Sequence, residues 1–129
     1  MRSARLAVVL DVACVLVFVI IGRASHGEGL TGVASTAWPF LAGLAGGWLA
    51  TAALAGRAWR PFGLWPAGVG AWLGTVALGM LFRVVSGQGI APAFIGVALA
   101  FLGLFLLGWR LLVRLGWLGW LGRLGWLRR

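Results

Sequence analysis

The sequence predicts an all-α integral membrane protein: a bundle of four transmembrane helices with both termini in the cytoplasm. Hydrophobic residues make up 62% of the 129 residues and charged residues only 10%, whereas soluble domains have about 45–50% and about 25%. A soluble chain of this length has too much surface to keep so many apolar side chains from water. Four long apolar stretches, separated by arginine-bearing segments, account for the excess.

Each apolar stretch has about the length that crosses a bilayer as a helix, which is ~20 residues. Strands are excluded because no segment of ~10 residues alternates with period two, as a membrane barrel requires. Pro39, Pro66 and Pro92 lie near the starts of their stretches, where a missing backbone N–H costs little. The predicted spans are residues 6–22, 34–56, 64–82 and 90–109, within a transmembrane domain at 1–113.

The arginines predict the orientation. With the N-terminus inside, only Arg23 and Arg83 of the eleven arginines fall outside, so the positive-inside rule favours N-in/C-in. Tryptophans near the span ends, among them Trp48 and Trp109, are typical of an interfacial aromatic belt. The alternative, a cleaved signal peptide at 1–22, is disfavoured because Asp11 interrupts the apolar run and no small-x-small cleavage site follows.

A repetitive tail follows the fourth span. From Gly116 it reads Gly-Trp-Leu twice, then Gly-Arg-Leu, Gly-Trp-Leu, Arg128 and Arg129. Interleaved Trp and Arg favour a cytoplasmic interfacial segment at residues 114–129, with anionic lipids as partners. The net charge of +9 does not indicate nucleic-acid binding, because the arginines border apolar stretches instead of gathering on one solvated face.

Asp11 is the most informative polar residue. It lies six positions after Arg5, about 9 Å into the first span, where a carboxylate is costly unless it is paired, hydrated or protonated. We favour an ion pair with an arginine at the same end of a neighbouring span, Arg110 being the first choice. The alternative is a proton or cation site, since desolvation raises the pKa of a carboxyl group.

A second polar group is expected at the outer face. Arg23 and Arg83 end the first and third spans, and His26 follows the first. The two arginines either clamp an anion or reach the lipid headgroups. We predict no metal, because zinc needs three or four suitable side chains, and no cofactor. Without a nucleophile–base–acid set, we also predict no enzymatic activity.

Small residues four apart form ridges through which membrane helices pack, either within the bundle or between copies in a homo-oligomer. The ridges are Gly43-Gly47-Thr51-Ala55, Gly70-Gly74 and the weaker Gly96-Ala100.

Several of these residues belong to a pattern that resembles a known family. Asp11-Val-Ala-Cys-Val-Leu-Val-Phe18, Gly22-Arg23-Ala-Ser-His26 and Thr36-Ala-Trp-Pro39-Phe40 look like the domain-of-unknown-function 3054 family of small bacterial membrane proteins. Gly79-Met-Leu-Phe-Arg83, Phe94 and Gly108-Trp109-Arg110 fit the same pattern. The resemblance runs from about residue 8 to residue 113 and leaves the tail outside. It implies a four-helix protein of unknown activity, which we expect in the bacterial cytoplasmic (inner) membrane.

Two functions are left open by the sequence. The favoured one is a non-enzymatic structural or partner-binding membrane component, in which Asp11 and Arg110 form a packing ion pair. The alternative is a small oligomeric proton-coupled transporter or ion channel. It would use Asp11 for coupling and Arg23, His26 and Arg83 at the outer face.

Overall fold

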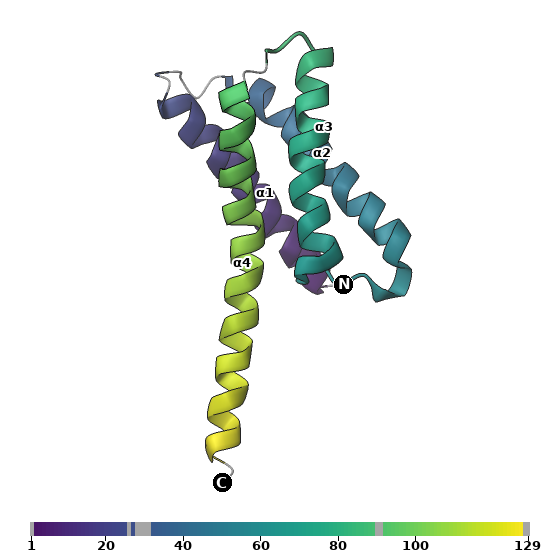
Figure 1. The fold of residues 1–129 in the computed structure, drawn as a ribbon, viewed down its shortest axis with the longest axis vertical. Helices are drawn as coiled ribbons and strands as arrows, with labels where there is room; N and C mark the ends of the chain where they lie inside the picture. The colour runs from purple at the N-terminus through teal and green to yellow at the C-terminus, as the bar shows by residue number, and fades with distance from the viewer. Residues whose placement is uncertain (1, 26, 28–31, 90–91, 128–129) are drawn as a thin grey trace.

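The computed structural model describes residues 2–25, 27, 32–89 and 92–127, and this part of the chain is helical almost throughout (Figure 1). Two short segments join the second helix to the third: a 3₁₀ turn at Gly56–Ala58 and an irregular turn at Leu64–Gly68. The long helices are α1 (Arg2–Ser25), α2 (Val33–Ala55), α3 (Val69–Val85) and α4 (Pro92–Leu127).

Four segments of the described chain are long and apolar enough to cross a membrane. They are Ala4–Ala24, Val33–Ala58, Leu64–Val85 and Pro92–Gly116. Each contains, or nearly contains, one of the spans predicted from the sequence. The predicted all-α class with four apolar spans is therefore confirmed.

Successive helices run in opposite directions (Figure 1). The N-terminus and the connector between α2 and α3 lie at one end of the bundle, which we call the N-terminal end. The end of α1, the start of α2, the end of α3 and the start of α4 lie at the opposite end. The last part of α4 extends beyond the N-terminal end of the other helices.

Helix α4 differs from the sequence prediction in length. Its 36 residues correspond to about 54 Å at ~1.5 Å per residue, well beyond a hydrocarbon core of ~30 Å. No break separates the predicted span at 90–109 from the predicted tail, because Leu, Trp and Arg sustain a helix and each Gly costs it only ~1 kcal/mol. That the tail lies along the membrane surface stays a prediction.

Helices α2 and α3 meet backbone to backbone. A Cβ atom on Gly43 would lie 2.6 Å from the Gly74 carbonyl oxygen, and one on Gly74 would lie 2.7 Å from the Gly47 Cα atom. The ridges of α2 and α3 therefore pack against each other inside the bundle. The third ridge is different, because nothing lies within 4 Å of a Cβ placed on Gly96.

An aromatic cluster fills the middle of the bundle and joins α1, α2 and α4. The ring of Phe18 meets that of Phe40 edge-on at 5.5 Å and that of Phe101 at 5.4 Å. Aliphatic side chains surround these rings, and Val15, Leu44 and Leu102 are completely buried.

Pro39 lies inside α2 instead of at its start. It has no N–H to donate to the Ser35 carbonyl oxygen one turn earlier. The side-chain amide of Gln88, which follows α3, donates to this oxygen at 3.1 Å. A residue 53 positions away in the chain thus satisfies the acceptor that the proline leaves open.

This arrangement predicts a non-additive pair of substitutions. We expect Gln88→Ala to lower the free energy of unfolding by about 1 kcal/mol. In a Pro39→Ala background the cost should fall, because the N–H of the new alanine can bind the Ser35 carbonyl. Denaturation in detergent, measured for the four proteins of the double-mutant cycle, tests this. Equal costs in both backgrounds would contradict it.

Candidate functional site

Asp11 of α1 and Arg110 of α4 form an ion pair inside the bundle. Arg110 Nη1 lies 2.7 Å from Asp11 Oδ1, and Nη2 lies 2.7 Å from Oδ2. Asp11 is completely buried, and only 1% of the surface of Arg110 is exposed. Both N–H···O contacts are short and parallel, which is the strongest geometry for an arginine and a carboxylate.

Two tryptophans complete the surroundings of the Asp11 carboxylate. Trp48 of α2 donates its indole N–H to Oδ2 at 2.8 Å, and Trp109 of α4 donates to Oδ1 at 2.8 Å. A carboxylate offers about four acceptor positions. The two indoles and the bidentate guanidinium therefore use the full acceptor capacity of Asp11.

The Arg110 guanidinium is equally well bound. Besides Asp11, it donates from Nη1 to the Leu106 carbonyl at 2.9 Å and from Nε to the Pro61 carbonyl at 3.1 Å. It also lies 4.4 Å from the centre of the Trp109 ring. Among the described residues, no buried side-chain nitrogen or oxygen lacks a hydrogen-bond partner.

Gly68, just before α3, makes room for Arg110. A Cβ atom at this position would lie 2.8 Å from Arg110 Cδ and 3.1 Å from the Gly63 carbonyl oxygen. The ion pair thus joins α1 to α4 and contacts α2 and the connector between α2 and α3. We refer to Asp11, Arg110, Trp48, Trp109 and Pro61 as the ion-pair cluster.

The structure brings Asp11 and Arg110 together, the pairing favoured from the sequence. Sequence reasoning missed the roles of Trp48, Trp109 and Pro61. It assigned both tryptophans to an interfacial belt. A tryptophan near the end of an apolar stretch gives the same sequence pattern whether its side chain faces lipid or the inside of the bundle. The available signal was the unmet acceptor capacity of a carboxylate inside a span, which calls for more donors than one arginine supplies.

The arginines at the opposite end have different partners. Arg23 donates from Nη1 to the Thr36 hydroxyl at 2.9 Å and so joins α1 to α2. Arg83 donates from Nη1 to the Gln88 side-chain oxygen at 3.1 Å and from Nη2 to the Gly89 carbonyl at 2.8 Å. His26, the third residue predicted for an outer-face site, lies outside the described residues. Within the described part of the chain, no three His, Cys, Asp or Glu side chains gather where they could hold a metal ion.

The fold and the ion-pair cluster define a class of protein: a four-helix chain, apolar enough to cross a membrane four times, whose first and fourth helices share a buried Asp–Arg pair. The model of the family described as protein of unknown function (DUF3054) matches residues 8–113. The chain belongs to this family, as the sequence motifs predicted. The match includes every residue of the ion-pair cluster and ends within α4. No curated protein and no solved structure gives a significant match.

Proposed function

We propose that the protein is a non-enzymatic structural or partner-binding component of the bacterial cytoplasmic membrane, and that the ion-pair cluster fixes the arrangement of its helices. The observation that supports this proposal is the complete ligation of Asp11 by Arg110, Trp48 and Trp109. Each of these hydrogen bonds ties α1 to another helix.

The same ligation argues against a role for Asp11 in coupling. A carboxylate that carries a proton or a cation must exchange it, and so needs an acceptor position that can open to water. Asp11 is fully buried and all of its acceptor positions are used.

The orientation that we propose has both termini in the cytoplasm. Arg5 lies near the start of α1, Arg57 and Arg60 belong to the α2–α3 connector, and Arg110 and Arg114 of α4 lie beside that connector, whereas Arg23 and Arg83 lie near the other ends of α1 and α3. This asymmetry supports the N-in/C-in orientation through the positive-inside rule. The lipid bilayer is the proposed partner of the helix surfaces that point away from the bundle. On these surfaces Leu49, Leu54 and Leu112 are more than two-thirds exposed.

Ion flux in reconstituted vesicles tests the proposal. We expect vesicles containing the wild-type protein to show the same proton and cation flux as protein-free vesicles at every pH. Asp11→Asn should change nothing, provided that only protein eluting as a folded species in detergent is reconstituted. A pH-dependent flux that the wild type supports and Asp11→Asn abolishes would replace this proposal with the transporter or channel.

A further inference from the structure

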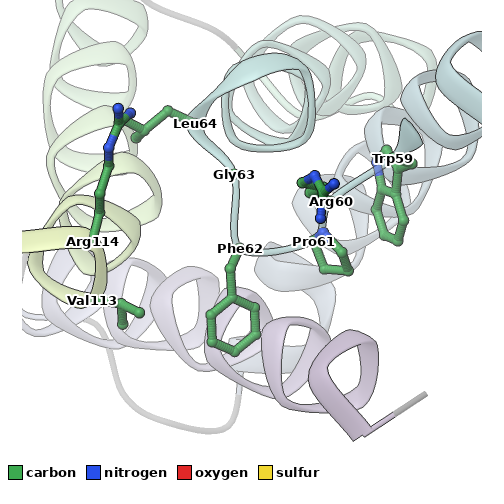
Figure 2. A pocket seen from close by; sticks show the side chains of 8 residues that line it. All are labelled: Trp59, Arg60, Pro61, Phe62, Gly63, Leu64, Val113 and Arg114. Carbon is green, nitrogen blue, oxygen red and sulfur yellow. The ribbon is translucent and has the colours of Figure 1, made fainter. Parts of the chain in front are cut away.

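A groove lies beside the ion-pair cluster, between the α2–α3 connector and α4 (Figure 2). Its volume is about 690 Å³, within the range of ~300–1,000 Å³ that is usual for small-molecule sites. The residues that line it are Trp59, Arg60, Pro61, Phe62, Gly63, Leu64, Val113 and Arg114.

The groove carries two positive charges from two different elements. Arg60 belongs to the connector and Arg114 to α4, and Figure 2 shows their side chains on either side of Gly63. Both residues are exposed, and the described structure gives neither guanidinium an ion pair or a hydrogen bond. The chain has only two acidic residues. Asp11 is paired with Arg110, and Glu28 lies outside the described residues.

The rest of the lining is apolar and firmly held. The Phe62 ring packs edge-on against the Trp109 ring at a centroid distance of 5.3 Å, and the Pro61 carbonyl accepts from Arg110 Nε. Two members of the ion-pair cluster therefore fix this part of the connector. A groove with apolar side chains and two cations suits an amphipathic ligand, which has an apolar part and an anionic group.

The position of the groove indicates where such an occupant comes from. Three apolar segments end at its level: Val33–Ala58 stops just before Trp59, Leu64–Val85 begins in the lining, and Pro92–Gly116 stops just after Arg114. In a bilayer that these segments cross, as proposed above, the groove would lie where the hydrocarbon core meets the headgroups. At this depth lipid phosphates and acyl chains are adjacent.

We propose that this groove binds one anionic phospholipid, with the phosphate between Arg60 and Arg114 and an acyl chain along Phe62, Leu64 and Val113. An anionic lipid is favoured over a zwitterionic one because the ammonium group of the latter would approach two guanidinium groups. The proposal is independent of the role of Asp11, since no lining residue is Asp11 or Arg110. Of the lining residues only Arg114 belongs to the predicted interfacial segment at 114–129, so the proposed site differs from attraction of lipid by the tail as a whole.

Native mass spectrometry of the full chain, released from detergent with added phosphatidylglycerol or phosphatidylcholine, tests the proposal. We expect one phosphatidylglycerol to stay bound at concentrations that leave phosphatidylcholine unbound. Each basic residue beside an anionic headgroup contributes about fivefold in affinity. The double variant Arg60→Gln/Arg114→Gln should therefore bind phosphatidylglycerol at least about tenfold more weakly.

Arg57→Gln is the matched control, because Arg57 is exposed on the same connector but does not line the groove. It should retain the affinity of the wild type, and an equal loss in this variant would overturn the proposal in favour of diffuse attraction. Val113→Trp, which fills the groove and keeps both charges, should weaken binding as well. Glycerol phosphate, a headgroup without chains, should not compete; if it did, a soluble phosphate compound would be the occupant and the proposal would be wrong.

Discussion

Replacing Asp11 with alanine should lower the free energy of unfolding by about 3–5 kcal/mol, the largest effect that we expect from a single side-chain truncation in this chain. The substitution leaves the Arg110 guanidinium buried without its counterion. It also leaves the indole N–H groups of Trp48 and Trp109 without their acceptor. The unfolding midpoint in a detergent series, followed by helical circular dichroism, measures the loss. Arg5→Gln, which changes an exposed charge on the same helix, should shift the midpoint little.

A second cycle separates the ion pair from its tryptophan ligand. Trp48→Phe keeps most of the ring and removes one hydrogen bond to a charged group, worth about 1.5–3 kcal/mol. In an Asp11→Ala background the same change should cost much less, because the acceptor is already gone. If Trp48→Phe cost the same with and without Asp11, the ring would act through packing alone.

The surroundings of Asp11 also predict what a charge swap will do. Asp11→Arg/Arg110→Asp would restore two opposite charges, which would suffice if the pair were isolated. The indole donors of Trp48 and Trp109 would then point at a guanidinium that has no acceptor to offer. We therefore expect the swap to recover less than half of the loss caused by Asp11→Ala. Full recovery would show that the tryptophan hydrogen bonds contribute little.

The ion pair and the spans could be predicted from the sequence because few alternatives exist. Asp11 is the only acid inside a predicted span, and the antiparallel order of four helices brings few arginines to its level. The unmet acceptors of Asp11 called for further donors but did not single out Trp48, since the rotation of α2 about its axis decides which side chains face inward. That rotation follows from contacts between α2 and α3, which one sequence does not reveal.

At the end of the bundle opposite the N-terminus, the sequence likewise does not show which side chains meet. Pro39 marks an open acceptor on Ser35, yet nothing in the sequence indicates that Gln88 fills it, because that depends on how two helix ends meet. The small-residue ridges are a similar case. Their spacing predicted close packing on α2, on α3 and, more weakly, on α4. In the structure the ridges of α2 and α3 pack against each other, and Gly96 faces open space.

The second large loss of stability is expected from a substitution at a glycine between α2 and α3. We expect Gly74→Ala to lower the free energy of unfolding by about 2–3 kcal/mol, because the added Cβ overpacks the α2–α3 contact. The Cβ would lie 2.7 Å from Gly47 Cα and 2.9 Å from the Gly43 carbonyl oxygen. Both neighbours are backbone, so no change of rotamer relieves the clash. Thermal denaturation in detergent measures the effect.

Gly96→Ala is the matched control, because it makes the same chemical change within a helix where the Cβ meets nothing within 4 Å. Alanine favours a helix over glycine by roughly 0.5–1 kcal/mol. We therefore expect this variant to be as stable as the wild type or slightly more stable. If both substitutions changed the free energy of unfolding by the same amount and in the same direction, the α2–α3 contact would be looser than in the structure.

The two large effects should be coupled, because Gly47 immediately precedes Trp48 on α2. Pushing α2 away from α3 displaces the Trp48 indole relative to Asp11, which α1 and Arg110 hold in place. Trp48→Phe should therefore cost less in a Gly74→Ala protein than in the wild type, although the atoms nearest to a Cβ at Gly74 belong to Gly43 and Gly47. Strict additivity of the two substitutions would show that the hydrogen bond from Trp48 to Asp11 does not depend on how closely α2 and α3 approach.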